Sequence, residues 1–233
     1  MPQVAERLAR IQADLHSIAT RSGRPDPALL AVSKTRGSGE IAALQAAGQR
    51  AFGENYVQEA LVKMRELAGI DIEWHLIGHL QSNKAKEAAM HFDWVQSVDR
   101  IKLVEALARH RASERGALNL LVQVNIDDEA SKHGCAPRDA EAICDAISAR
   151  PLLALRGLMA IPAPADDLAV RRDAFRAMRE LFDQLRQRFP SMDTLSMGMS
   201  DDAALAVSEG STMVRIGTAL FGPRPPKNGE GLS

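Results

Sequence analysis

The chain has 233 residues, with 29 basic and 30 acidic side chains and a formal charge of −1. That length suits one large domain or two small ones, and the balanced charge excludes a dedicated binder of nucleic acids or anionic membranes, which carries a basic excess. No apolar run approaches the roughly 20 residues of a membrane span, and the charges in MPQVAERLARIQADL exclude the apolar core of a signal peptide.

The first predicted element is an amphipathic helix over residues 3–21, which the segment SGRPDP ends. Its apolar side chains recur at steps of three and four residues, on one helix face: Val4, Leu8, Ile11, Leu15 and Ile18. The clearest later helix, residues 168–189, carries a similar stripe that includes Phe175, Met178 and Phe182. Both stripes predict helices that pack on a core.

Between and beyond these two helices, short apolar runs alternate with helix-like stretches. The runs predict strands at 29–33, 50–53, 72–77, 92–98, 118–126, 153–161, 194–198 and 212–216. The helix-like stretches are 38–47, 56–68, 81–90, 100–112, 137–149, 168–189 and 201–209. Strands that alternate with helices are parallel and joined by crossovers. Eight of them in about 200 residues fit an α/β fold, a single (β/α)8 TIM barrel near its lower size limit. A doubly wound open sheet is the alternative.

No linker divides the chain, so we expect one TIM barrel over residues 1–222, with the first helix as an addition. The tail, residues 223–233, reads PRPPKNGEGLS, whose polar, Pro- and Gly-rich composition is typical of a flexible end. Cys135 and Cys144 fit no metal-ligand spacing, which predicts a reduced, cytoplasmic protein. No large apolar surface is evident, so we expect a monomer.

Lys34 directly follows the first predicted strand, where a TIM barrel carries its functional residues. Loss of solvation at that position disfavours the ammonium form and leaves a nucleophilic amine, which forms Schiff bases with aldehydes. The alternative is a lysine whose head group simply reaches solvent at the strand end. Position alone leaves both interpretations open.

Hydroxyl and glycine residues follow the last two predicted strands. Ser200 is a candidate helix N-cap, with Asp201 and Asp202 in the first helical turn, and Gly217 and Thr218 follow the last strand. Barrels commonly hold a phosphate near strands seven and eight, on backbone N–H groups and hydroxyls. Ordinary capping and turn chemistry is the alternative.

Arg215 lies inside the apolar strand MVRIG, where an arginine is costly unless it is paired. It either meets a carboxylate or reaches a ligand, and we favour the ligand. His75 and His79 lie four residues apart with no suitably spaced third ligand, so no metal is expected. Packing or hydrogen bonding is the expected role of His75. Tyr56, the chain's one tyrosine, either caps the pocket or packs on the next helix.

Several of these segments together resemble the YggS/PROSC family of pyridoxal phosphate homeostasis proteins. The segments are, in chain order, AVSKT, FGENYVQE, WHLIGHLQSNK, QSVDR, QVNI, GLMAIP and LSMGMSDD followed by GSTMVRIGTALFG. They run from about residue 31 to residue 222, which is nearly the whole chain. Matches this long and this numerous are highly specific.

The resemblance implies a barrel like the N-terminal domain of alanine racemase, with pyridoxal 5′-phosphate held as a covalent aldimine on Lys34. It implies further cofactor contacts as follows: the phosphate on Ser200, Gly217 and Thr218, the pyridine nitrogen facing Arg215, and Asn55 and His75 lining the pocket. It also implies a role in cofactor handover for Lys132, and it leaves Lys84 without a role.

Members of this family are thought to bind, buffer and deliver the cofactor without robust catalysis. The resemblance therefore implies a carrier rather than an enzyme, with pyridoxal phosphate as its ligand and apo pyridoxal-phosphate enzymes as recipients. An arginine at the ring nitrogen stays charged, keeps that nitrogen unprotonated and weakens the electron sink that pyridoxal enzymes use.

The main alternative is a pyridoxal-phosphate enzyme with weak amino-acid racemase activity. The resembling racemases take a second catalytic base, a tyrosine, from a partner's extra β-domain, and these 233 residues contain no such domain. Without the resemblance, a barrel enzyme that acts on a phosphorylated metabolite through Lys34 stays open as a third hypothesis.

Overall fold

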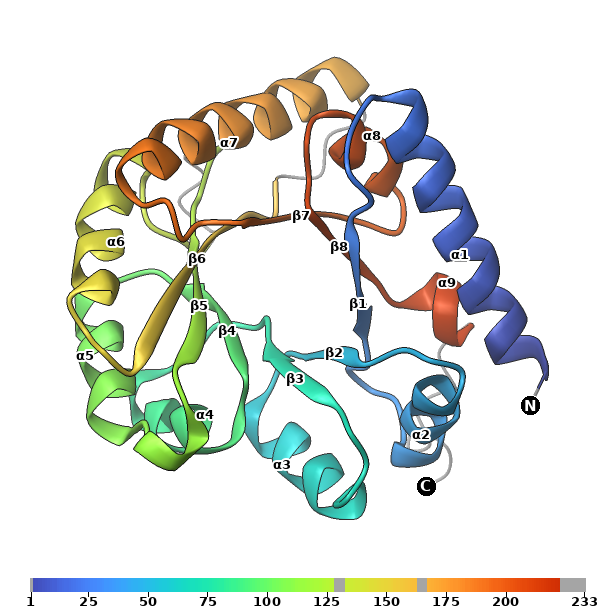
Figure 1. The fold of residues 1–233 in the computed structure, drawn as a ribbon, viewed down its shortest axis with the longest axis horizontal. Helices are drawn as coiled ribbons and strands as arrows, with labels where there is room; N and C mark the ends of the chain where they lie inside the picture. Colours follow the sequence, from blue (N-terminus) through green and yellow to red (C-terminus); the bar gives the residue numbers. More distant parts are fainter. Residues whose placement is uncertain (1, 128–132, 163–166, 223–233) are drawn as a thin grey trace, which may run out of the picture.

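The apolar runs form parallel strands that close into one barrel in chain order, with β1 hydrogen-bonded to both β2 and β8 (Figure 1). The structure is a computed structural model that describes residues 2–127, 133–162 and 167–222. The strands are β1 (Ala28–Val32), β2 (Ala51–Glu54), β3 (Glu73–Leu76), β4 (Trp94–Val98), β5 (Leu118–Gln123), β6 (Leu153–Met159), β7 (Thr194–Met199) and β8 (Met213–Ile216). The predicted TIM barrel is therefore confirmed.

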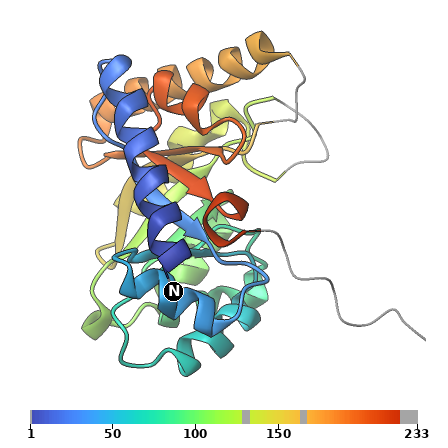
Figure 2. The same cartoon turned by 90° about the vertical axis from the view of Figure 1, so that its right-hand side faces the viewer.

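Helices form a ring around the strands (Figure 1). They are α1 (Pro2–Arg21), α2 (Ser38–Ala46), α3 (Val57–Glu66), α4 (Ala85–His91), α5 (Ile101–His110), α6 (Ala140–Ser148), α7 (Leu168–Arg188), α8 (Ala203–Ser208) and α9 (Thr218–Phe221). The predicted additional N-terminal helix is confirmed as α1, which packs along the outside of the barrel against α2, α8 and α9 (Figures 1 and 2).

Large apolar side chains fill the layer between the strands and the helices. Phe52 of β2, Phe92 before β4, and Phe175 and Phe182 of α7 are each at most 1% exposed. Full burial of one such side chain stabilises the fold by roughly 1.5–3 kcal/mol. Because the helices cover the outer face of the sheet and the barrel interior covers the other, the strands appear in the sequence as nearly continuous apolar runs.

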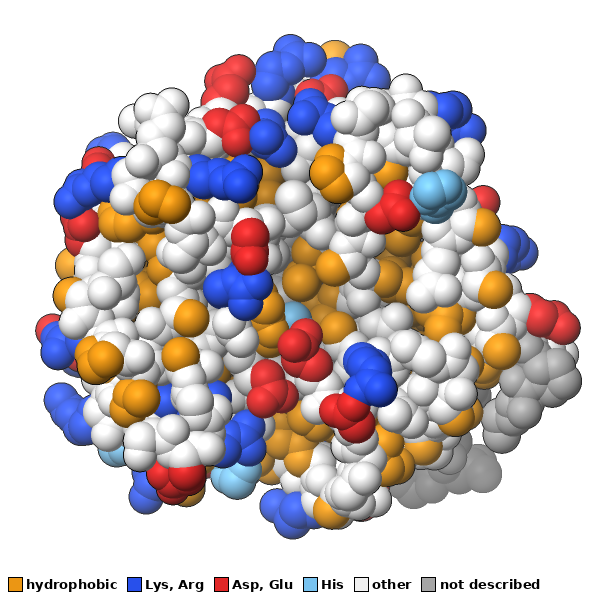
Figure 3. All heavy atoms as spheres, in the orientation of Figure 1, with side chains coloured by type: hydrophobic (Ala, Val, Ile, Leu, Met, Phe, Trp, Pro, Cys, Tyr) orange, Lys and Arg blue, Asp and Glu red, His pale blue; other side chains and the backbone are white. Residues whose placement is uncertain are grey.

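The barrel interior is packed with inward-facing side chains. Two apolar clusters lie there, Leu30 with Ile77 and Met213, and Trp94 with Leu121 and Met159. Buried polar side chains accompany them from four strands: His75, Gln96, Ser196 and Arg215. In the view of Figure 3, along the barrel, hydrophobic side chains are visible in the central hollow and charged side chains spread around it.

The structure departs from the predicted elements in small ways. The first turns of two predicted helices are 3-10 turns, Ser82–Lys84 before α4 and Pro137–Asp139 before α6. The sequence pattern does not predict α9, whose four residues are too short for a periodic signal. The expected tail, residues 223–233, lies outside the described residues. Among the described helices none is long and apolar enough to cross a bilayer.

Candidate functional site

A cavity of about 680 Å³ opens at the carboxyl ends of the barrel strands. Small-molecule sites in proteins commonly occupy roughly 300–1,000 Å³. The lining residues lie at the strand ends or in the loops that follow: Val32, Lys34, Arg36, Asn55, Ile77, Gly78, His79, Gln123, His133, Ile161, Met199, Ser200, Asp201, Arg215, Gly217 and Thr218. We call this space the mouth cavity.

Most of the predicted cofactor contacts line the mouth cavity. They are Lys34, Asn55, Ser200, Arg215, Gly217 and Thr218. These residues belong to β1, β2, β7 and β8 or follow them, and the closure of the barrel places those four strands side by side. The predicted contacts alone therefore bring together one partly buried amine, one guanidinium group and two hydroxyl groups from opposite ends of the sequence.

A buried network behind the barrel wall holds the backbone next to Lys34. From α3, Lys63 Nζ donates to the Ser33 carbonyl oxygen at 2.9 Å and to Glu54 Oε1 at 2.7 Å. Ser33 Oγ donates to the same carboxylate oxygen at 2.5 Å. Burial raises the pKa of the Glu54 carboxyl, although Lys63 and Ser33 act to lower it. On the other side of Lys34, Thr35 has a left-handed φ of 64°, which is unfavourable for a threonine.

Arg215 extends from β8 into the barrel interior and is 3% exposed. Its Nη1 donates to Ser196 Oγ at 2.8 Å and to the Ser196 carbonyl oxygen at 2.9 Å, and its Nη2 donates to the Ala160 carbonyl oxygen at 2.8 Å. No described carboxylate lies within ion-pair distance of it. Burial lowers its pKa to about 10, against the opposing effect of Asp202, so the group stays cationic at pH 7. Of the two roles considered for it, the structure therefore favours a side chain that reaches the cavity.

The hydroxyl-bearing residues lie on one side of the mouth cavity, after the adjacent strands β7 and β8. Ser200 and Thr218 are both exposed, and Gly217 lies at the start of α9. The predicted N-cap role of Ser200 is wrong, because α8 begins at Ala203 and Asp202 is its N-cap. The Asp202 carboxylate accepts the Met199 N–H at 2.6 Å instead.

His75 does not line the mouth cavity. Its ring is fully buried in the barrel interior and stacks on Trp94, with the ring centroids 5.1 Å apart. Ile77, the next inward-facing residue along the chain, lines the cavity in its place. The expected packed and hydrogen-bonded role of His75 is confirmed, whereas the pocket-lining position that the resemblance implies is not. Burial lowers the pKa of His75 against the opposing effect of Glu73, so the ring is neutral at pH 7.

The cavity is also lined by three basic side chains that were not predicted to belong to it: Arg36, His79 and His133. Arg36 follows Lys34 by two residues, but the chain turns at residues 34–35, so strand alternation does not predict its position in the cavity. His79 and His133 come from different loops and stack with ring centroids 3.9 Å apart. Burial and His133 together lower the pKa of His79. No sequence pattern pairs these two rings.

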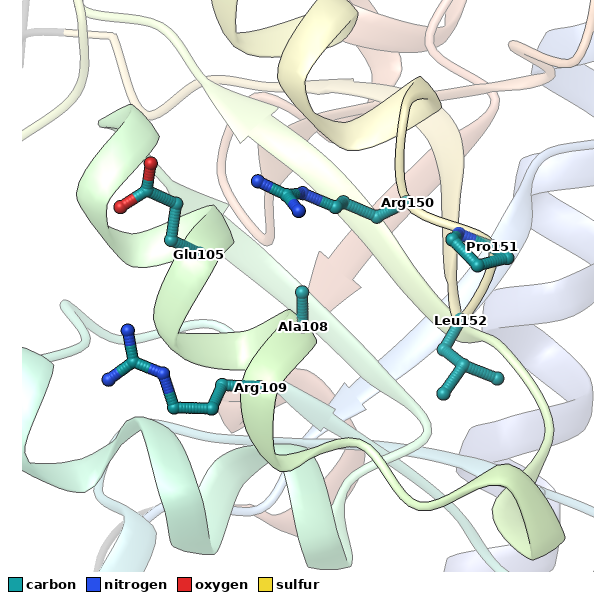
Figure 4. Close-up of a pocket in the computed structure, with 6 residues that line it drawn as sticks. All are labelled: Glu105, Ala108, Arg109, Arg150, Pro151 and Leu152. Carbon is teal, nitrogen blue, oxygen red and sulfur yellow. The ribbon is translucent and has the colours of Figure 1, made fainter.

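A second, smaller cavity of about 380 Å³ lies between α5 and the segment after α6 (Figure 4). It is lined by Glu105, Ala108, Arg109, Arg150, Pro151 and Leu152, none of which is a predicted site residue. Tyr56 lines neither cavity, and its side chain is exposed next to α3. Lys132, predicted to act in handover, lies outside the described residues.

The chain is similar to known proteins along nearly its whole length. A family model of the alanine racemase N-terminal domain matches residues 7–225. The pyridoxal phosphate homeostasis protein of Pseudomonas aeruginosa is 50% identical over 227 residues, which cover 96% of this chain and 97% of that protein. The protein of the same name from Escherichia coli K12 is 47% identical over 229 residues, covering 96% and 98%.

Solved structures agree with the sequence comparison. PipY of Synechococcus elongatus with bound pyridoxal phosphate has a TM-score of 0.81 and 41% identity to this chain, covering 94% of this chain and 100% of PipY. Alanine racemase of Corynebacterium glutamicum has a TM-score of 0.73 at 19% identity, and the match covers 97% of this chain and 64% of the racemase, so the two share the fold. The chain therefore belongs to the family of pyridoxal phosphate homeostasis proteins, whose barrel is that of the alanine racemase N-terminal domain.

Proposed function

We propose that the chain binds pyridoxal 5′-phosphate in the mouth cavity, as a Schiff base on Lys34, and that it buffers and delivers this cofactor inside the cell. The observation that carries the proposal is the convergence of Lys34, Arg215, Ser200 and Thr218 on one cavity. The name of the family and the pyridoxal phosphate bound to PipY support the choice of ligand.

The residues present fit the chemical groups of this cofactor. Among the described lining residues Lys34 is the one lysine, and its amine can condense with the cofactor aldehyde, forming a C=N bond and releasing water. Arg215 only donates hydrogen bonds, so it suits an unprotonated pyridine nitrogen. The hydroxyls of Ser200 and Thr218 and the N–H of Gly217 are donors for the phosphate. Asn55 completes the set of lining residues that the resemblance implies.

Two features favour holding the cofactor over reacting with it. When bound, the cofactor supplies an electron sink that is strong only if its ring nitrogen is protonated, and a cationic arginine opposes that protonation. The chain's one tyrosine, Tyr56, is 64% exposed and does not line the mouth cavity. The described part of the cavity therefore offers no tyrosine as a base on the second face of the cofactor.

Absorbance spectroscopy with added pyridoxal phosphate tests the proposal. Wild-type protein should show a Schiff-base band that hydroxylamine removes, and Lys34→Ala should lack the band. The substitution changes one partly buried side chain at a strand end, so the free energy of unfolding should change by no more than about 0.5 kcal/mol. Lys86→Ala is the matched control, because Lys86 is exposed on α4 away from the cavity, and it should keep the band.

Absence of the band in the wild type, or its persistence in Lys34→Ala, would overturn the proposed site. A screen of amino acids separates carrier from enzyme: clear racemisation that Lys34→Ala abolishes would replace the carrier with the racemase alternative. Delivery is tested by mixing loaded protein with an apo pyridoxal-phosphate enzyme, whose activity should recover.

A further inference from the structure

A chain of hydrogen-bonded side chains runs through the barrel interior from the mouth cavity to the opposite end. Arg215 Nη1 donates to Ser196 Oγ at 2.8 Å, and Ser196 Oγ donates to Gln96 Oε1 at 2.7 Å. Gln96 Nε2 lies 2.9 Å from His75 Nδ1, and His75 Nε2 lies 2.8 Å from Glu73 Oε1. We call these five residues the interior chain. It begins at a residue that lines the cavity and ends at the first residue of β3.

The two ends of the interior chain fix the direction of every bond in it. Arginine can only donate and an ionised carboxylate can only accept. Because Ser196 Oγ accepts from Arg215, its single hydrogen goes to Gln96 Oε1. The Gln96 amide nitrogen then donates to Nδ1 of His75, which leaves the ring proton on Nε2 to bond the Glu73 carboxylate. Every group is paired in this single arrangement.

The middle of the interior chain is buried, and its Glu73 end reaches solvent. Ser196, Gln96 and His75 are 0% exposed and Arg215 is 3% exposed, whereas the Glu73 side chain is 47% exposed. Aligned hydrogen bonds polarise one another, and they do so more strongly in a medium of low dielectric constant. Glu73 is thus the solvent-accessible end of a chain whose other end lies at the cavity.

Other charged groups also act on the middle of the interior chain. Asp93, which precedes β4, acts on His75 electrostatically in the same sense as Glu73. From β6, Arg156 lies over the ring of Trp94, 4.7 Å from its centroid, and Trp94 stacks on His75. From β8, Arg215 is linked to the ring through Ser196 and Gln96. Of these groups only Glu73 is hydrogen-bonded directly to the Nε2 atom of His75, on the side of the ring that faces away from the cavity.

We propose that Glu73 is a positioning residue for the mouth cavity: through the interior chain it holds Arg215 in place and partly balances the charge that Arg215 presents there. The proposal rests on the proposed function, in which Arg215 faces the ring nitrogen of pyridoxal phosphate. Without the carboxylate, the buried Nε2–H of His75 has no acceptor, which favours the Nδ1–H tautomer and a turned Gln96 amide. The turned amide presents its nitrogen to Ser196, so the Ser196 hydroxyl loses its acceptor. Arg215 then loses an oriented acceptor and the negative end of its chain.

Variants at residues 73 and 71 test the proposal with pyridoxal phosphate as the probe. Glu73→Leu removes the acceptor and the charge, and Glu73→Gln removes the charge alone. Asp71→Asn is the matched control. Asp71 lies just before β3 and outside the interior chain, and its 74% exposed carboxylate pairs with Arg50. The readout is the pH midpoint of the cofactor's absorbance change. A more positive cavity disfavours protonation of the bound cofactor, so Glu73→Leu should lower the midpoint by about half a pH unit or more, Glu73→Gln by less, and Asp71→Asn should leave it unchanged.

A second readout needs no cofactor. Nitrogen-15 NMR of the histidine rings should show the wild-type His75 ring neutral and protonated on Nε2, with a mixture of tautomers in Glu73→Leu. If Glu73→Leu fails to fold, Glu73→Gln carries both readouts. A midpoint equal to that of the wild type in both Glu73 variants, or an equal shift in Asp71→Asn, would overturn the inference. If the wild-type protein binds no pyridoxal phosphate, the proposed function fails instead, and a single tautomer in Glu73→Leu would independently refute the interior chain.

Discussion

Glu54 and Lys63 form a buried ion pair between β2 and α3, and the same lysine bonds the backbone of Ser33, next to Lys34. The Glu54 side chain is 0% exposed, and its Oε2 has no hydrogen-bond partner among the described residues. A buried pair of this kind contributes little net stability compared with apolar residues of the same shape, but the loss of one partner leaves an unpaired buried charge. The pair therefore links the stability of the barrel wall to the geometry of the site.

We predict that Lys63→Met lowers the free energy of unfolding by about 3–5 kcal/mol at pH 8, because it strands the Glu54 carboxylate. The loss should be smaller at pH 5. Burial already raises the pKa of Glu54, and Lys63 is one of the groups that lower it, so the variant raises that pKa further. A carboxyl whose folded-state pKa is raised stabilises the fold at low pH, and this stability disappears as the pH rises through that pKa.

Urea denaturation at the two pH values measures this effect. The double variant Lys63→Met/Glu54→Leu should recover part of the loss at pH 8, because no buried charge remains. Lys86→Met, at an exposed position of α4, is the control and should change stability by no more than about 0.5 kcal/mol. A loss independent of pH and unchanged in the double variant would show that lost packing, and not charge, is responsible.

At the scale of elements, β-bulges decide which strand residues face the interior. The pairing of β5 with β6 shifts register between Leu120 and Leu121, and Gly157 lies at the shift on β6 with φ of 148°. A side chain at this position would collide with the Thr194 carbonyl oxygen and approach the Phe182 ring. Glycine is therefore required both by its conformation and by the close approach of β7.

We predict that Gly157→Ala destabilises the protein by about 2–4 kcal/mol, from an unfavourable φ and overpacking together. Gly39→Ala is the matched control, because Gly39 lies in α2 and an added Cβ there meets nothing within 4 Å. That control should stabilise the protein by about 0.5–1 kcal/mol through a better helix propensity. Urea denaturation of both variants checks the opposite signs, and a tolerated Gly157→Ala would contradict the account of the bulge.

Apolar runs and helix stripes were enough to predict the order and type of the strands and the long helices, since each such signal is local. Bulges are not local, because the shift at Gly157 depends on how β6 meets β5 and β7. The depth of His75 is likewise a property of the closed barrel: alternation gives the side of the strand, and only the assembled strands decide that Ile77 lines the cavity. The Lys63 partner of Glu54 is also set by helix packing that no spacing in the sequence reveals.

At the scale of the whole molecule, barrel closure creates the site. β1 lies between β2 and β8, so Lys34 near the start of the chain and Thr218 near its end line one cavity. The sequence could supply the residues of this site through their motifs, but their meeting follows from closure. Because all eight strands are hydrogen-bonded into one closed barrel, the integrity of the fold can be measured at residues far from the site.

The two cysteines report on that integrity. Cys144 of α6 is 0% exposed and Cys135 is 8% exposed, and burial raises the pKa of both thiols to about 12. At pH 8 a thiol with that pKa is ionised in roughly one molecule in 10⁴, compared with about one in ten at the ordinary value of 9.0, and the thiolate is the reactive form. Folded protein should therefore react with a disulfide reagent about a thousandfold more slowly than unfolded protein.

Cys135→Ala and Cys144→Ala isolate the two thiols in this experiment. The backbone N–H of Cys135 donates to the carbonyl oxygen of Gln123, which lines the mouth cavity, so added pyridoxal phosphate should slow the labelling of Cys135 by stabilising the folded state. Cys144, behind the strands, should be labelled only when the barrel unfolds, at a rate that rises with urea. Rapid labelling of Cys144 in the folded protein would mean that the helical layer opens without the barrel, and that the fold is less cooperative than a closed sheet requires.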